Sequence, residues 1–179
     1  MKKRGSKLKL PEISLRLNNY DDMFSDFDPR AYTQRALSVD FLEEVDRASR
    51  DKNMGQLDLN FLIPRYKRDK RYENQIKKRL KDHFKKHYFL FEKEKKEIIN
   101  KGTIFILIGI FLMFLATLIL YLYRERSLTT TFLVVLFEPG GWFFFWEGLS
   151  QVIFESKGIN PKLEFYKKMN KSRIDFFSE

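Results

Sequence analysis

The sequence has no cysteine among its 179 residues and only two histidines. The absence of cysteine excludes a disulfide framework, thiolate metal ligands, iron–sulfur clusters and a cysteine nucleophile. The sequence also lacks an internal repeat, a glycine-rich phosphate-binding loop and a nucleophile elbow. We therefore predict a protein that is not an enzyme and that needs no cofactor or metal.

The N-terminal sequence also lacks an export signal. The first nineteen residues are basic but contain no apolar segment of the kind that directs secretion. We expect the first hundred residues to stay in the compartment where they are made.

Residues 103–123 form a long apolar stretch without an ionisable acid or base. At about 1.5 Å per residue, these 21 residues span a hydrocarbon core of about 30 Å. A buried helix of a soluble protein would need surrounding apolar elements, which the chain lacks. The pattern therefore predicts a transmembrane helix.

A second apolar stretch covers residues 128–154, with a predicted span of about 128–150. It is less regular, because five charged or helix-breaking residues interrupt it: Glu138, Pro139, Gly140, Gly141 and Glu147. The link that begins at Arg124 is too short to hold a domain. We therefore predict an antiparallel transmembrane hairpin over residues 102–154, with both termini on one side.

Lysine and arginine predict which side that is. Twelve of them lie within about 20 residues of the outer ends of the two spans, against two in the link. Because basic residues favour the cytoplasmic side, we expect a multi-pass protein of the inner (cytoplasmic) membrane with both termini in the cytoplasm.

Charge divides the residues before the first span into three blocks. Residues 1–9 carry a net charge of +5, residues 10–64 carry −5, and residues 65–101 carry +9. We predict a basic tail (1–9), a cytoplasmic α+β domain (10–101) and a cytoplasmic C-terminal region (155–179).

Two apolar alternations predict strands, because side chains alternate between the faces of a strand. The first alternation is Ile13, Leu15 and Leu17; the second is Leu57, Leu59, Phe61 and Ile63. Between them, Asp28-Pro29 predicts the start of one helix and Ser38 the cap of another. Gly55 is expected to end the second.

After Pro64, apolar residues recur every three or four positions: Tyr72, Ile76, Leu80, Phe84, Tyr88 and Phe91. This spacing predicts a long basic amphipathic helix that leads into the first span, which completes a βαβα domain. Asn160-Pro161 predicts the start of a C-terminal helix, and residues 174–177 a last strand. We expect this strand to join the sheet, since two strands alone are marginal.

A set of short motifs resembles an uncharacterised family of small two-span prokaryotic membrane proteins with a cytoplasmic N-terminal domain. The motifs are Asp28-Pro29, Ile63-Pro64, His83-Phe84, Gly102 to Gly109, Gly140-Gly141-Trp142, Trp146 and Leu163-Phe165-Tyr166. The chain departs from the family pattern at Glu147-Gly148-Leu149. The resemblance implies this architecture and no activity.

Glu138 and Glu147 are candidate functional residues, because acids inside a membrane span are costly and rare. Glu138 lies near mid-membrane if the second span covers residues 128–146, and at the outer interface if the span starts at Pro139. An ion or proton role and a helix-kinking position beside Pro139 both remain open.

Small residues recur every seven positions in both spans and predict close helix packing. They are Gly102, Gly109 and Ala116 in the first, and Gly141 and Gly148 in the second. We expect them to pack the hairpin against itself; an oligomer seam is the alternative.

Aromatic and basic residues predict contacts with lipid. Trp142 and Trp146 are typical of an interfacial anchor. Four lysines just before the first span are expected to contact anionic headgroups: Lys93, Lys95, Lys96 and Lys101. Nucleic acid is a weaker alternative partner.

His83 and His87 stand four residues apart, a spacing that can chelate zinc on one helix face. No third ligand is apparent, so we favour histidines that are solvated or packed.

The sequence therefore predicts a membrane-anchored interaction module whose cytoplasmic domain binds an unknown protein partner or another copy of itself. The alternative is a small oligomeric ion channel or membrane-disrupting effector that the cytoplasmic domain gates. An enzyme that uses Glu138, Glu147 and His83 is disfavoured, because His83 lies outside the predicted spans.

Overall fold

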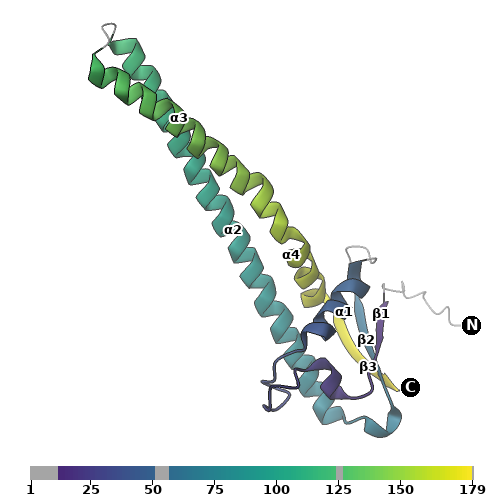
Figure 1. The fold of residues 1–179 in the computed structure, drawn as a ribbon. Coiled ribbons are helices and arrows are strands. Elements are labelled where there is room, and N and C mark those ends of the chain that lie inside the picture. Colours follow the sequence, from purple (N-terminus) through teal and green to yellow (C-terminus); the bar gives the residue numbers. More distant parts are fainter. Residues whose placement is uncertain (1–11, 51–56, 124–126, 179) are drawn as a thin grey trace, which may run out of the picture. The chain divides into compact units, whose positions relative to one another are not determined.

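The computed structural model describes residues 12–50, 57–123 and 127–178 (Figure 1). Its contacts divide the chain into two compact units. The sheet unit consists of Met1–Phe89 and Lys162–Glu179, and the hairpin unit of Leu90–Pro161.

The sheet unit contains a three-stranded parallel sheet in the order β1-β2-β3. The strands are β1 (Glu12–Arg16), β2 (Asp58–Ile63) and β3 (Arg173–Ser178). Leu59 of β2 lies opposite both Ile13 of β1 and Ile174 of β3. The two predicted strands and the C-terminal strand that joins them are confirmed.

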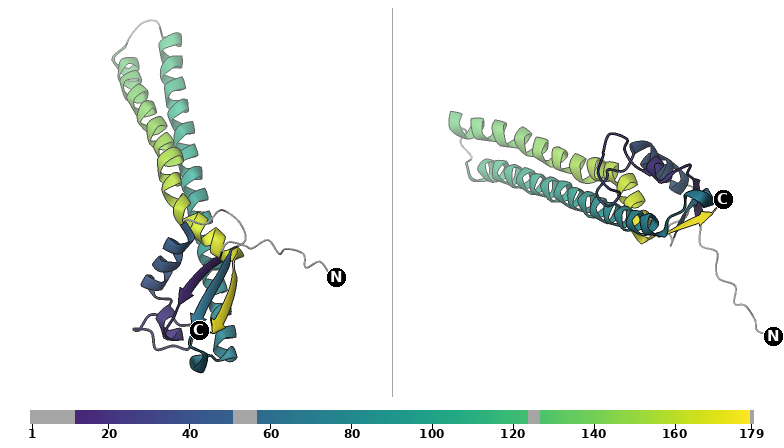
Figure 2. Two further views of the ribbon diagram at one scale, coloured as in Figure 1. Left: turned by 90° about the vertical axis from the view of Figure 1, so that its right-hand side faces the viewer. Right: turned by 90° about the horizontal axis from the view of Figure 1, so that it is seen from below.

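One face of this sheet is covered by α1 (Val39–Arg50) and by parts of α2 (Lys70–Leu122) and α4 (Ser156–Lys171) (Figure 2). The core combines alternate strand residues with one face of each helix: Leu59, Phe61, Ile63, Ile174, Phe176, Val45, Ile76, Leu80, Phe84 and Met169. The four-residue apolar spacing on α2 is therefore confirmed at Ile76, Leu80 and Phe84, whereas Tyr72, at the start of the predicted series, is 44% exposed.

The opposite sheet face is largely uncovered by the described residues. Five of its side chains are exposed: Ser14, Arg16, Arg173, Asp175 and Phe177. Leu62 and Asp58 are half-buried between them, and Asn60 is buried in the central strand. We call these eight residues the open face.

The predicted helix start at Asp28-Pro29 is wrong. Residues 24–38 form a loop between a 3-10 turn (Tyr20–Met23) and α1. The Asp28 carboxylate accepts hydrogen bonds from the backbone N–H groups of Arg30 and Ala36, at 3.2 and 2.6 Å, and so closes this loop instead of capping a helix. The one helix in this region begins at Val39, directly after Ser38; Gly55 lies outside the described residues.

The predicted helix start at Asn160-Pro161 is also wrong, since α4 begins at Ser156 and Pro161 lies inside it. Pro161 is exposed, so its ring points away from the packed side of the helix. Because proline has no N–H, the carbonyl of Lys157 has no helical donor there.

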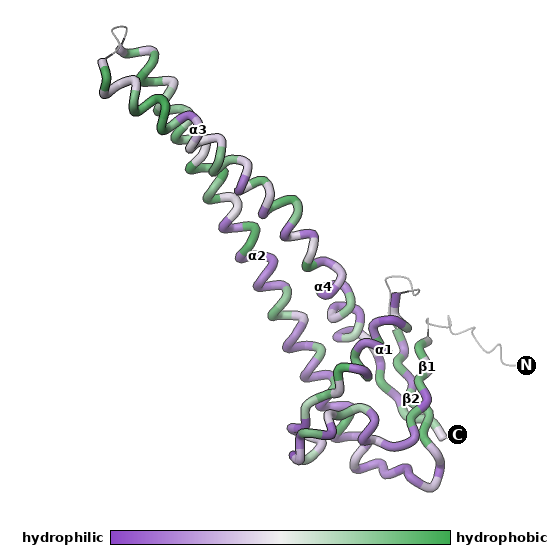
Figure 3. Tube along the Cα trace, in the orientation of Figure 1, coloured by the Kyte–Doolittle hydropathy of each residue, from purple (hydrophilic) through white to green (hydrophobic). Residues whose placement is uncertain are grey.

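The hairpin unit contains the second part of α2, α3 (Leu128–Ser150), a π-helical turn (Gln151–Glu155) and the start of α4. α3 continues through Pro139, so the irregular turn lies at its end and not at the proline. Two helices are long and apolar enough to cross a membrane, Lys70–Leu122 and Leu128–Lys171. Figure 3 shows their apolar residues gathered on α2 and α3.

The apolar surface of these helices faces outward. Only 11% and 6% of their most apolar segments are buried. A core helix of a soluble protein would be mostly buried, so this surface needs an apolar environment that the described part of the chain does not supply.

Candidate functional site

The glycines of the hairpin unit lie where α2 and α3 touch. A Cβ atom on Gly109 would lie 2.6 Å from the Phe145 nitrogen and 2.7 Å from the Gly141 carbonyl oxygen. A Cβ atom on Gly148 would lie 2.5 Å from the Gly102 oxygen. Only glycine permits these backbones to approach so closely. Ala116, the third small residue of α2, is 4% exposed.

The glycine contacts set the register of the two antiparallel helices. Gly102 lies against Gly148, and Gly109 against Gly141. Continuing this pairing residue by residue places Glu138 level with Leu112, one residue from the middle of the 103–123 apolar run. The depth of Glu138 in a membrane stays a prediction, with both of the positions that the sequence leaves open.

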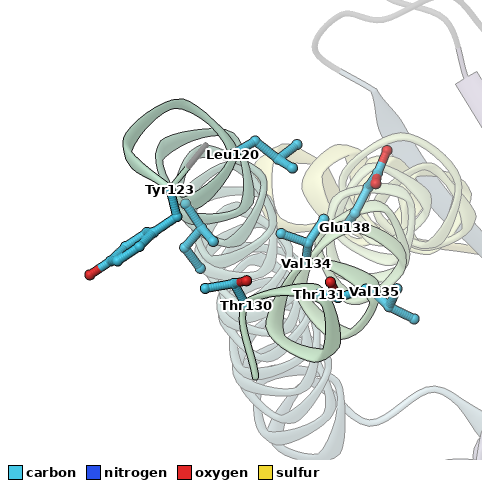
Figure 4. A pocket seen from close by; sticks show the side chains of 8 residues that line it. Leu120, Tyr123, Thr130, Thr131, Val134, Val135 and Glu138 are labelled. Atoms are coloured by element: carbon cyan, nitrogen blue, oxygen red, sulfur yellow. The ribbon is translucent and has the colours of Figure 1, made fainter. Parts of the chain in front are cut away.

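Glu138 is exposed on α3, and Figure 4 shows its carboxylate pointing out from the helix, away from Tyr123 and Thr130. It borders a hollow of about 250 Å³ between the two helices. The lining is mainly apolar, with two threonine hydroxyls: Ile119, Leu120, Tyr123, Thr130, Thr131, Val134, Val135 and Glu138. Residues 103–123 and 128–154 contain no lysine, arginine or histidine that could pair with this acid.

Glu147 occupies a different position. The same register places it level with Thr103, at the end of the apolar run. Its Oε1 accepts a hydrogen bond of 2.9 Å from Nε2 of Gln151, one turn further along the chain. The two acids are therefore not equivalent, because Glu147 has a polar partner and lies level with the end of the apolar run of α2.

The two tryptophans are exposed on α3, Trp142 by 49% and Trp146 by 60%. Their rings stack with centroids 6.4 Å apart. By the same register Trp146 is level with Ile104, near the end of the apolar run, and Trp142 lies about 6 Å further along α3, toward the middle of that run.

The four predicted lipid-contacting lysines lie in the hairpin unit. Lys93 is 3.5 Å from Glu97, and Lys95 donates a 2.7 Å hydrogen bond to the side-chain oxygen of Asn160. Lys101 lies 5.8 Å from the ring centre of Phe105. Lys93, Lys96 and Lys101 are exposed, whereas Lys95 is half-buried.

The two histidines lie in the sheet unit with ring centres 4.2 Å apart, and Tyr166 stacks on His87. Burial, followed by the nearby charges of His87, Arg79 and Lys86, lowers the pKa of His83 to about 4. Burial also lowers the pKa of His87. Within the described residues, no group of three or more potential ligands could hold a metal ion.

The sheet unit also contains a buried polar network that the sequence alone did not indicate. Arg68 donates to both carboxylate oxygens of Glu73, at 2.8 and 3.1 Å, and to the Phe176 carbonyl and Ser178 Oγ of β3, each at 3.0 Å. The Tyr20 hydroxyl donates to Glu73 and accepts from the Asp69 N–H. Burial, opposed by the Asp69 hydrogen bond, raises the Tyr20 pKa.

This network ties β3 to the start of α2. Arg68 and Glu73 are five residues apart and do not lie on one helix, so no helical spacing in the sequence indicates the pair.

Comparison of the chain with family models, with curated proteins and with solved structures gives no match. The resemblance to a two-span membrane family therefore stays a prediction.

Proposed function

We propose that the chain is a non-enzymatic protein that crosses the inner membrane twice and carries a cytoplasmic interaction unit. The observation that carries this proposal is the pairing of β2 with β3. The whole apolar hairpin lies between these strands in the sequence, and yet they are neighbours in one sheet.

This pairing supports a two-span topology. A sheet whose strands precede and follow the hairpin requires both flanking segments to lie on one side of a membrane, which an even number of spans provides. The surplus of basic residues flanking the hairpin favours the cytoplasm as that side.

The open face supports an interaction role. Parallel sheets are nearly always covered on both faces, but the described residues cover only one face of this sheet. Arg16, Leu62 and Phe177 lie in one row across the open face, which combines charge with apolar area. We propose that this surface binds a protein partner or another copy of the chain.

Alkaline extraction of membranes, followed by the mass of the detergent-solubilised particle from light scattering, tests the proposal. The chain is expected to resist extraction. Phe177→Asp on the open face is expected to abolish self-association or capture of a cross-linked partner. The matched control is Phe89→Asp, because Phe89 is 52% exposed and Phe177 48%. Release at alkaline pH, or equal behaviour of the two variants, would overturn the proposal.

The oligomeric channel is the second candidate, and the glycine register, which places Glu138 level with the middle of the apolar run of α2, supports it. Two helices cannot enclose a pore, so this function requires an assembly of several hairpins. A solubilised particle of one or two chains would exclude it. A larger particle whose ion flux falls in Glu138→Gln would support it.

A further inference from the structure

Within the described hairpin, no polar group solvates the Glu138 carboxylate. An ionisable side chain inside a membrane normally faces the interior of a helix bundle or pairs with another polar group. Glu138 instead is exposed on α3, and the glycine register places it level with the middle of the apolar run of α2.

The exposed position follows from the helix geometry. Glu138 precedes the contact residue Gly141 by three positions, so it lies about 60° around the helix from the α2 contact. One turn to either side, Val135 and Trp142 are 64% and 49% exposed. These three residues form a surface that we call the Glu138 face, which is separate from the glycine contact between α2 and α3.

Among the described residues, no cation is placed to neutralise this acid; Arg124 and Arg126 lie outside them. Neither apolar run has a basic residue, and Glu138 is ten residues, or about 15 Å, from the start of α3 at Leu128. A second copy inserted in the same direction cannot supply one either. Symmetric copies in a membrane place identical residues at identical depth, so acid would meet acid.

Charge complementarity therefore favours a different protein, and not a second copy of the chain, as the partner of the Glu138 face. We propose that the Glu138 face binds a transmembrane helix of another protein that carries a lysine or arginine near the middle of its span. The inference rests on the proposed membrane insertion and specifies the chemistry of the partner. The hollow of about 250 Å³ beside Glu138 gives the long stem of such a side chain apolar surface to lie against.

A synthetic helix can serve as the partner in a direct test. The full chain is reconstituted in lipid vesicles with a labelled leucine–alanine helix that carries one central lysine, and association is measured by energy transfer. The control peptides carry leucine at the centre, or lysine seven residues away from it. A central position has the same depth in either orientation of the peptide.

We expect the central-lysine peptide to bind at least tenfold more tightly than either control peptide. Glu138→Gln is expected to abolish this preference, whereas the matched variant Glu147→Gln should retain it. Equal affinities for the three peptides, or a preference that survives in Glu138→Gln, would overturn the inference. Self-association would also overturn it. The evidence for self-association would be energy transfer between differently labelled copies of the chain that is lost in Glu138→Gln, in an experiment that shows no preference for lysine.

Insertion is measured separately on the same vesicles, by quenching of the two tryptophans with brominated lipid. Both tryptophans lie on α3. Absent quenching would overturn the proposed function and this inference together. Quenching without lysine preference would overturn the inference alone.

Discussion

Two adjacent glycines of α3 provide a matched test of the hairpin packing. A Cβ atom at Gly141 would lie 2.7 Å from Cγ of Met113 and 2.9 Å from the Gly109 carbonyl oxygen, whereas a Cβ atom at Gly140 meets nothing within 4 Å. Alanine at either position gains up to about 1 kcal/mol in helix propensity. Only Gly141→Ala must also separate α2 and α3, because one of its contacts is backbone.

Overpacking of this kind costs about 1–3 kcal/mol. We therefore expect Gly141→Ala to be less stable than Gly140→Ala by about 1–3 kcal/mol, because the helix propensity that both variants gain cancels in the comparison. The assay is SDS titration of the chain in mixed micelles. Tryptophan fluorescence reports on the hairpin alone in this assay, since both tryptophans belong to α3. Equal transition midpoints for the two variants would refute the assigned helix contact.

Three further predictions concern the sheet unit. Glu73→Gln leaves the half-buried Arg68 guanidinium without its carboxylate and should lower the free energy of unfolding by about 2–4 kcal/mol, seen as faster hydrogen exchange in β3. Glu97→Gln, in an exposed pair, should change it by less than about 1 kcal/mol. Acid should destabilise the sheet unit: since the His83 pKa is about 4 when folded and 6.5 when unfolded, the unfolded chain binds more protons below pH 6.5. Neutral His83 therefore contributes at most about 3 kcal/mol to the free energy of unfolding above pH 6.5, and this contribution is lost as the pH falls to 4. In chemical denaturation, His83→Phe should make the stability depend less on pH. Phe176→Ala should lower the free energy of unfolding by about 3–5 kcal/mol, measured by thermal denaturation, because Phe176 is only 6% exposed. The neighbouring Phe177→Ala should lower it by less than about 1 kcal/mol. Equal losses of stability in the two variants would contradict the assigned core face.

Periodic apolar patterns predicted the parts of the fold that depend on a single buried face. Ile76, Leu80 and Phe84 lie one above another on a helix, and this spacing alone identifies their common face. The C-terminal strand was predicted by the same logic, since its alternating Ile174 and Phe176 suit a sheet that needs a further strand.

Predictions based on one polar or proline residue were less reliable, because such residues have several uses. The Asp28 oxygen that suits a helix cap instead closes a loop by binding Ala36. Pro161 suits a helix start but lies inside α4.

Contacts between segments distant in the sequence were not predictable from local patterns. The Arg68–Glu73 pair reaches β3 more than a hundred residues away. The depth of Glu138 likewise depends on which glycine of α2 meets which glycine of α3.

Cysteine labelling is a direct test of the proposed topology of the hairpin. The chain has no cysteine of its own, so single substitutions at the exposed residues Thr33, Ser127 and Lys167 give clean signals. With a membrane-impermeant maleimide, the account predicts that Ser127→Cys reacts in intact cells, whereas Thr33→Cys and Lys167→Cys react only after permeabilisation. Labelling of Thr33→Cys and Lys167→Cys from opposite sides, or equal labelling of all three, would contradict it.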